Sequence, residues 1–305
     1  MNPLTGVVGA LLTPFAEDGN PDRGLLEGEY DFLTGHCDAV SVLGAEVSEY
    51  RTLTNPQRRE LLVAAVQALR GRTRVLAGIS APTVAEAVEL AEIAADAGAE
   101  FGQLLLPQRP WGGTPGRHEL LSYVQQVADR SPLPLVLYHQ PGLGADPAFD
   151  LLVEACAVDG VVALKDSSRD ISRNLRAVAE IQDAGHAQYL GTVQPMLAIL
   201  LSGGAGAMMP PPFTLVGAEI RDAVAAADLA RAGRAQSMVA RLPAAWAGHG
   251  LLPLAKAAMQ AIGRPLGSPA VPFDAPPAPV LEAIAEITKT WPDLPAVETN
   301  SGVTN

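Results

Sequence analysis

Short apolar runs alternate with segments of helical periodicity along most of this chain. The runs are rich in β-branched residues, and a turn separates each of them from the helical segment that follows. This order is typical of a parallel sheet whose strands are joined by helices. We predict strands at Val7–Leu12, Ala39–Leu43, Arg74–Ile79, Phe101–Leu106, Leu133–Tyr138, Val161–Leu164, Gln188–Leu190 and Gly206–Met209.

Eight strand–helix units with short connections predict a (β/α)8 TIM barrel over residues 1–225. An open doubly wound sheet is the alternative, but no Gly-x-Gly-x-x-Gly motif follows an early strand. Ala-rich segments after the barrel predict a C-terminal helical subdomain over residues 226–296. Residues 297–305 are expected to form a disordered tail.

Two of the predicted helices carry recognisable end signals. Asn55 is expected to cap the helix that continues to Leu69, with Pro56 at its first position. Thr83 is expected to cap the next helix, which Gly98 ends.

Composition excludes several classes of protein. The net charge of -12 argues against a nucleic-acid partner, which needs a basic surface. Two cysteines, Cys37 and Cys156, make no disulfide framework, and the histidines show no metal-ligand spacing, so no metal is implied. With no signal peptide and no apolar stretch of the roughly 20 residues that a membrane helix needs, we expect a soluble cytoplasmic protein.

Lys165 directly follows the apolar strand Val161–Leu164. The carboxyl ends of barrel strands are where catalytic groups lie. A lysine desolvated there loses its proton more easily and becomes a nucleophile toward a carbonyl carbon. The alternative is that Lys165 only ends the strand and points to solvent.

Tyr138 ends the preceding strand, as Lys165 ends its own. Neighbouring strands lie about 5 Å apart, so both side chains are expected at one rim of the barrel. A phenol beside an amine can transfer protons while an imine forms. An ordinary strand-end aromatic is the alternative for Tyr138.

These residues belong to an ordered set of motifs. Thr13-Pro14-Phe15 is followed by Asp18-Gly19, then by Ser48-Glu49, by Tyr138 and by Leu164-Lys165-Asp166-Ser167-Ser168. Together they resemble the dihydrodipicolinate synthase/N-acetylneuraminate lyase family of Schiff-base aldolases and dehydratases.

The resemblance implies a role for each matching residue. Lys165 would be the Schiff-base lysine and Tyr138 the proton-relay tyrosine, with no separate cofactor. Thr13 would support the floor of the substrate site, and Ser48 and Glu49 would hold the loop after the second strand. A homo-oligomer, a dimer or a tetramer, is also implied.

The chain departs from the family pattern at several places. Glu46 and Val47 stand where the family carries two hydroxyl residues. Leu143 stands where the synthases often carry an arginine, and Pro107–Trp111 lacks the family's second tyrosine. We therefore expect that this chain is not an authentic dihydrodipicolinate synthase.

Other residues are expected to compensate within the substrate site. The planar guanidinium of Arg109 suits a carboxylate, although a solvated loop charge is the alternative. Glu46 is expected to act as a general base or to pair with Arg109. The glycine-rich face of the strand Gly206–Met209 leaves room beside the lysine, so Thr13, Val47 and Met208 complete the expected substrate-binding set.

We therefore predict a lyase that forms a lysine Schiff base with a pyruvate-like 2-oxo acid and makes or breaks a C–C bond. Two alternatives stay open at this point. One is a 2-keto-3-deoxy sugar-acid dehydratase that uses the same lysine, and the other is a barrel that has lost catalysis and binds a small ligand.

Overall fold

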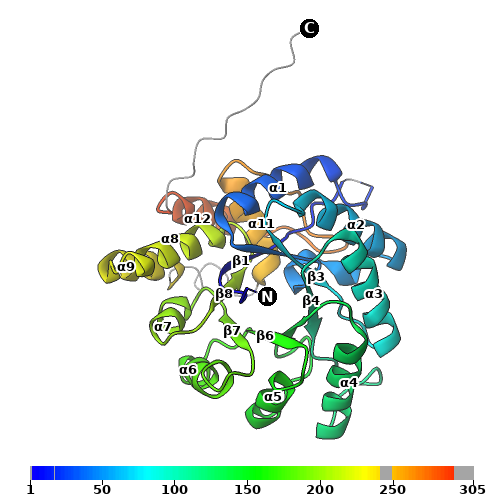
Figure 1. Cartoon of the computed structure of the whole chain (residues 1–305). Helices are drawn as coiled ribbons and strands as arrows, with labels where there is room; N and C mark the ends of the chain where they lie inside the picture. The colour runs from blue at the N-terminus through cyan, green and yellow to red at the C-terminus, as the bar shows by residue number, and fades with distance from the viewer. Residues whose placement is uncertain (1, 17, 241–248, 292–305) are drawn as a thin grey trace.

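The strands form a closed barrel of eight parallel strands, paired in chain order from β1 to β8 (Figure 1). The computed structural model describes residues 2–16, 18–240 and 249–291. The predicted TIM barrel is therefore confirmed. The strands are β1 (Gly6–Ala10), β2 (Ala39–Val42), β3 (Arg74–Gly78), β4 (Phe101–Leu105), β5 (Leu135–His139), β6 (Val161–Asp166), β7 (Gln188–Gly191) and β8 (Gly206–Met209).

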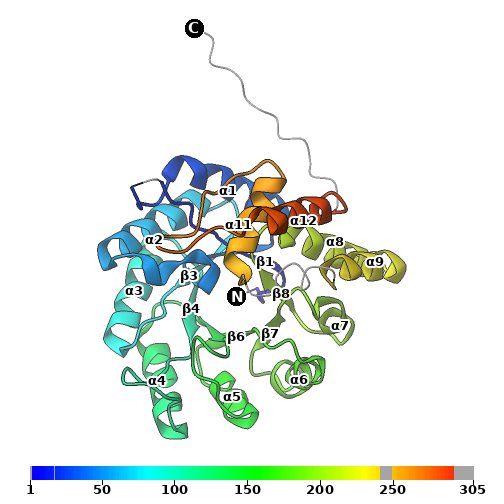
Figure 2. The ribbon, with the colours of Figure 1, turned by 180° about the vertical axis from the view of Figure 1, so that it is seen from behind.

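Helices surround the barrel and alternate with its strands (Figures 1 and 2). Sequence placed most of them to within a few residues, but the cap of α2 is Thr54, one residue before the predicted Asn55. Thr54 closes a capping box with Gln57, since each side chain bonds to the other's backbone N–H. The helices of the barrel are α1 (Arg23–His36), α2 (Asn55–Leu69), α3 (Val84–Ala97), α4 (Arg117–Arg130), α5 (Phe149–Cys156), α6 (Ile171–Ala177), which continues as the π-helical turn η3 (Val178–Gln182), α7 (Met196–Leu201) and α8 (Phe213–Ala225).

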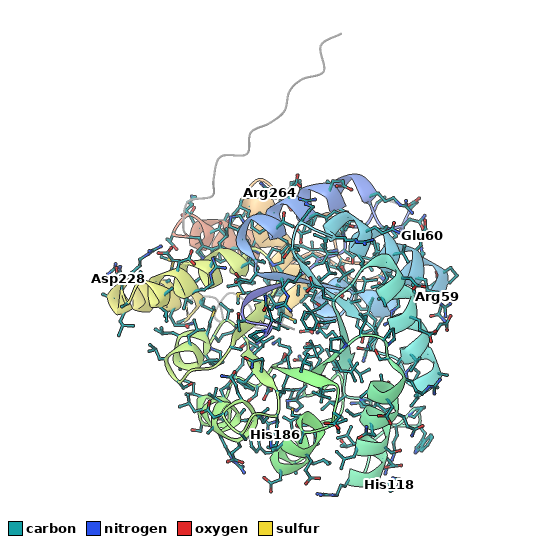
Figure 3. All side chains as sticks on the ribbon, in the orientation of Figure 1. Arg59, Glu60, His118, His186, Asp228 and Arg264 are labelled. Carbon is teal, nitrogen blue, oxygen red and sulfur yellow. The ribbon has the colours of Figure 1, made fainter. Side chains whose placement is uncertain are left out.

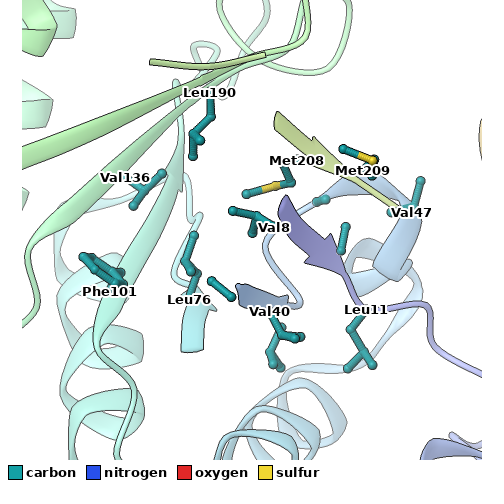
Figure 4. Packing of buried hydrophobic residues seen from close by; sticks show 14 of the residues in the cluster. Val8, Leu11, Val40, Val47, Leu76, Phe101, Val136, Leu190, Met208 and Met209 are labelled. Carbon is teal, nitrogen blue, oxygen red and sulfur yellow. The ribbon is translucent and has the colours of Figure 1, made fainter. Parts of the chain in front are cut away.

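Side chains from different strands fill the inside of the barrel. Val8, Leu76, Val136 and Leu190 gather there in Figure 4, and all four are fully buried. Packed apolar layers of this kind close the barrel interior, so the room for a ligand lies toward one end of the strands.

Gly206 allows strands β1 and β8 to approach closely. A Cβ atom on Gly206 would lie 2.0 Å from the carbonyl oxygen of Gly6, and its φ of +149° is one that other residues rarely adopt. The glycine of β8 therefore serves the closure of the barrel.

The helices that follow the barrel within the described residues are α9 (Leu229–Ala240), α11 (Leu251–Ala261) and α12 (Ala278–Thr288). In Figure 2, α11 lies across the barrel opening and packs against α12. The predicted tail at residues 297–305 lies outside the described residues. Within the part of the chain that the structure describes, no helix is long and apolar enough to cross a membrane.

Candidate active site

Lys165 lies inside strand β6, one residue before its end, and is 4% exposed. Its Nζ donates a hydrogen bond to Ser167 Oγ at 3.2 Å. Burial lowers the pKa of Lys165 from 10.5 to about 8, although the charges of Glu46 and Asp166 oppose that shift. An amine with this pKa is partly neutral near pH 7.5, so it can act as a nucleophile.

Tyr138 lies beside Lys165, because the two residues are direct partners in the β5–β6 register. Lys165 Nζ lies 5.9 Å from the centre of the Tyr138 ring. The Tyr138 hydroxyl donates a hydrogen bond to Glu46 Oε2. Burial and the neighbouring Glu46 carboxylate raise the pKa of Tyr138 well above 10, so its hydroxyl keeps its proton at neutral pH.

A cavity opens above these three side chains. It holds about 550 Å³ of space free of atoms, including its open mouth. Glu46, Val47, Tyr138, Lys165 and Met208 all line it, so five of the predicted site residues meet around one cavity. Its other described lining residues are Ala10, Ala45, Gln140, Ser167, Arg169, Thr192, Val193, Gln194, Met209, Pro210, Phe213 and Leu251.

The loop after β2 carries Glu46 and Val47 into the cavity in a short 3-10 turn, η1 (Glu46–Ser48). Thr13 Oγ1 donates a hydrogen bond to the backbone oxygen of Ser48 at 2.6 Å, and Ser48 Oγ donates to Ala45 O at 2.5 Å. Thr13 is fully buried and is not among the residues that line the cavity. Thr13 and Ser48 thus hold the loop in place, and the predicted contact of Thr13 with substrate is corrected to an indirect one.

Glu49 ties the same loop to the C-terminal helices. Its carboxylate lies 2.6 Å from Lys256 Nζ of α11 and accepts a hydrogen bond at 2.6 Å from the backbone N–H of Ala270. Both charged side chains are almost fully buried, at 3% and 2% exposure. Glu49 therefore has the geometry of a structural residue of the site.

Arg109 is placed elsewhere. Its guanidinium forms a bidentate pair with Glu119, with a closest distance of 2.6 Å, and it does not line the cavity. The Glu119 carboxylate also accepts a hydrogen bond from Gly116 N at the start of α4. The prediction that Arg109 binds substrate or pairs with Glu46 is wrong for this arrangement, because the carboxylate of Glu119, in the first turn of α4, holds the guanidinium outside the cavity.

Several cavity residues were missed by sequence reasoning. Gln140 and Thr192 follow the ends of β5 and β7, while Ser167 and Arg169 follow the end of β6. The signal that could have found them is the same one that found Lys165, since all four lie just beyond carboxyl ends of barrel strands.

A buried polar network supports the strand ends behind the cavity. Asp166 Oδ1 lies 2.8 Å from His139 Nδ1, and Arg173 Nε donates to Asp166 Oδ2 at 3.2 Å. Burial alone would raise the pKa of Asp166, but His139 and the hydrogen bond from Ser168 N hold it below its usual value. These contacts fix β5 against β6 and thereby the relative positions of Tyr138 and Lys165.

No three His, Cys, Asp or Glu side chains come together as a metal site in the described ranges. Figure 3 shows His118 and His186 apart from one another, and both are exposed. The chemistry that this arrangement can support is therefore that of an amine, a phenol and a carboxylate around a small cavity.

Comparisons with known proteins agree with this arrangement. The model of the dihydrodipicolinate synthetase family matches residues 3–287. The 4-hydroxy-tetrahydrodipicolinate synthase of Methanoculleus marisnigri is 32% identical over 235 residues, covering 74% of this chain and 78% of that protein. The enzyme of the same name from Mycolicibacterium paratuberculosis is 30% identical over 273 residues, covering 88% of this chain and 89% of that protein.

Solved structures of low sequence identity share the fold. The E. coli K12 prophage protein YagE, solved in complex with pyruvate, superposes with a TM-score of 0.85 at 22% identity and covers 93% of this chain and 97% of its own. A dihydrodipicolinate synthase from Bacillus anthracis also has a TM-score of 0.85, at 20% identity, and covers 96% of this chain and 100% of its own.

Proposed function

The chain belongs to the dihydrodipicolinate synthetase family, and we propose that it is a lyase that joins Lys165 to a pyruvate-like 2-oxo acid as a Schiff base. The observation that carries this proposal is the burial of Lys165 at the base of a cavity, with its pKa lowered to about 8 and Tyr138 beside it. A lysine kept only for structure would gain nothing from a lowered pKa or from an adjoining cavity. The complex of YagE with pyruvate agrees with a substrate of this size.

In the first half of the reaction, neutral Lys165 attacks the carbonyl carbon of the substrate. A C–N bond forms and the carbonyl electron pair moves to oxygen. Tyr138 accepts a proton from the nitrogen and gives its own proton to that oxygen, which makes a neutral carbinolamine. Tyr138 then donates its proton to the hydroxyl, the C–O bond breaks, water leaves, and the nitrogen electron pair forms a protonated imine, which leaves Tyr138 as a phenolate. Glu46 holds the Tyr138 hydroxyl in place for these transfers, because the two side chains share a hydrogen bond.

In the second half, the protonated imine withdraws electrons from the neighbouring carbon. In the addition reaction, the Tyr138 phenolate takes the proton of a C–H bond at that carbon, the resulting enamine forms a C–C bond with an aldehyde, and Tyr138 returns the proton to the aldehyde oxygen. In the cleavage reaction, the phenolate takes the proton of a hydroxyl on the next carbon, the C–C bond breaks, an aldehyde leaves, and Tyr138 returns the proton to the enamine carbon. Water then adds to the imine carbon, the C–N bond breaks, the 2-oxo acid leaves, and the remaining proton returns to Tyr138, which restores the neutral amine. Burial favours this step because Tyr138 and Glu46 act with little competition from solvent.

Dehydration is a second candidate for the same site. The Glu46 carboxylate lines the cavity beside the lysine, where the family motif has a hydroxyl residue. A carboxylate there can remove the proton next to the imine and return it to a hydroxyl that leaves as water. We place C–C chemistry slightly ahead, and a barrel that only binds a ligand third.

We also propose that the chain is not an authentic dihydrodipicolinate synthase, because Glu46, Val47 and Leu143 replace family residues that hold substrate carboxylates. A cytoplasmic location and a homo-oligomeric assembly belong to the same proposal and rest on the family resemblance.

Borohydride trapping tests the proposed function. The protein is incubated with pyruvate or longer 2-oxo acids, reduced, and analysed by intact and peptide mass. We expect one adduct, on Lys165, which is absent in Lys165→Ala. Folded wild-type protein that gives no adduct with any of these acids would refute the Schiff-base mechanism and support the ligand-binding barrel.

Tyr138→Phe tests the proton relay in the same assay. This variant should still form the pyruvate adduct, but about a hundredfold more slowly, since general acid–base catalysis typically contributes 10²–10⁴. An unchanged rate of adduct formation would remove Tyr138 from the mechanism.

A further inference from the structure

Arg169 is a charged cavity residue that the mechanism above does not use. It follows Lys165 by four positions in the connection between β6 and α6, lines the cavity and is exposed. Arg173, four positions further along the chain, is paired with Asp166. Among the described residues, none forms an ion pair or a hydrogen bond with the Arg169 side chain.

Two buried polar atoms face the same cavity. Gln140 Oε1 and Thr192 Oγ1 are both shielded from solvent and have no hydrogen-bond partner in the described part of the chain. Buried polar atoms in folded proteins are almost always hydrogen-bonded, so partners for these two are expected from whatever fills the cavity. They come from the ends of β5 and β7, the two strands that flank Lys165.

The side chains that line the cavity lie at different depths. Lys165 is 4% exposed and lies at the floor, whereas Arg169 is exposed at the mouth. A substrate whose carbonyl carbon is bonded to Lys165 therefore meets Arg169 with its far end. Glu46 contributes negative charge near the floor, where it disfavours a second carboxylate close to Tyr138.

We propose that Arg169 binds a carboxylate at the end of the substrate away from the reacting carbonyl, while Gln140 and Thr192 bind hydroxyl groups between the two ends. The inference rests on the proposed function and names its substrate class, a hydroxylated 2-oxo acid with a second carboxylate. A guanidinium presents two parallel N–H donors that match a carboxylate. Arg169 is the arginine among the described lining residues of the cavity, and one guanidinium suits a singly charged group better than a phosphate dianion.

Matched pairs of 2-oxo acids test this proposal by borohydride trapping. 2-Oxoglutarate and 2-oxovalerate have the same chain length, but the first ends in a carboxylate and the second in a methyl group. 2-Oxoadipate and 2-oxohexanoate form a second such pair, whose chain is one carbon longer. We expect wild-type protein to be trapped at least tenfold faster by the diacid of one pair at low concentration. Arg169→Gln should bring that ratio to about one and still give a pyruvate adduct on Lys165.

Arg176→Gln is the matched control, because Arg176 is an arginine of α6 that pairs with Asp150 and Glu180 outside the cavity. It removes the same charge and should keep the wild-type ratio. Arg169→Lys should keep part of the preference, since it retains the charge without the two-donor geometry. Equal trapping of both members of each pair by wild-type protein, or the same loss of preference in Arg176→Gln, would overturn the proposal.

Thr192→Val tests the middle of the cavity. With 2-oxo diacids that carry a hydroxyl on the chain, this variant should lose at least threefold in trapping rate relative to wild type, and it should lose nothing with 2-oxoglutarate. Equal losses with both kinds of acid would contradict the role given to Thr192.

Failure of the Schiff-base mechanism is distinguishable from failure of this inference. If no 2-oxo acid is trapped, glutarate, which has two carboxylates and no ketone, is used as a thermal-shift probe. A rise in melting temperature in wild type that is absent in Arg169→Gln would support the anion site without the lysine chemistry. The same rise in both proteins would refute it.

Discussion

The pKa of Lys165 predicts how imine formation depends on pH. A lysine with its ordinary pKa of 10.5 is only about one-thousandth neutral at pH 7.4, whereas one with a pKa of about 8 is about one-fifth neutral. Burial thus raises the concentration of the reactive amine by roughly two hundredfold. The rate of imine formation should rise about tenfold per pH unit below pH 8 and level off above it.

Glu46→Gln should lower the pH midpoint of imine formation, which is the pH at which the rate levels off. The Glu46 charge raises the pKa of Lys165 and so opposes the effect of burial. A nearby opposite charge typically shifts a pKa by about 1–3 units, and one unit corresponds to about 1.4 kcal/mol. The midpoint should therefore fall by at least about one pH unit, while the glutamine oxygen still accepts the hydrogen bond from Tyr138.

The assay is rapid quenching of a pyruvate reaction with borohydride, followed by intact mass, at a series of pH values from 6 to 9.5. Lys165→Ala supplies the baseline, and Glu119→Gln removes a carboxylate outside the cavity and should leave the midpoint unchanged. Circular dichroism at each pH checks that the protein is folded. A wild-type midpoint near 10.5, or a midpoint that rises in Glu46→Gln, would refute the reasoning.

Three further predictions concern stability. Burial raises the pKa of Glu29 from 4.5 to about 8, so folding stability should fall as pH rises from 4.5 to 8, because the unfolded chain loses this proton first. Glu29→Gln should remove that dependence, so its free energy of unfolding, measured by urea titration, should rise by about 3 kcal/mol relative to that of wild type between pH 5 and pH 8. The same pH dependence of the free energy of unfolding in both proteins would contradict this prediction. Lys256→Met should lower the free energy of unfolding by about 3 kcal/mol, because it leaves the buried Glu49 carboxylate unpaired. Adding Glu49→Gln should restore part of that loss, whereas additive losses in the double variant would argue against an interaction between the two residues. Gly206→Ala should cost several kcal/mol or abolish soluble expression, because the new Cβ would overlap the backbone of Gly6; a melting temperature within a degree of wild type would contradict this.

Strand positions and the reactive lysine were predictable because they depend on local pattern. Apolar runs bounded by turns located all eight strands, and the same pattern placed Lys165 and Tyr138 at strand ends that a parallel barrel brings to one rim. Boundaries were less predictable. The cap of α2 moved to Thr54, where a reciprocal pair of hydrogen bonds with Gln57 is available.

Arg109 and Arg169 show where sequence reasoning stopped. Both are loop arginines near carboxyl ends of strands, and sequence reasoning singled out Arg109 for the substrate site. In the fold, Glu119 is close enough to hold Arg109 outside the cavity, whereas Arg169 lines the cavity and has no carboxylate partner among the residues that the structure describes. The direction of a loop side chain depends on which opposite charge lies nearest in space, and periodicity carries no record of that distance.

By itself, the sequence determined the order of strands and helices, the barrel that such an order closes into, and the presence of an amine and a phenol at neighbouring strand ends. Only the tertiary structure decided that Tyr138 bonds to Glu46, that Glu49 pairs with Lys256 across 207 positions of the chain, and which arginine reaches the cavity. Secondary structure follows from short-range sterics and hydrogen bonding, which neighbouring residues specify. The lowered pKa of Lys165 and the contents of its cavity follow from burial and from charges brought together by folding, which only three-dimensional packing specifies.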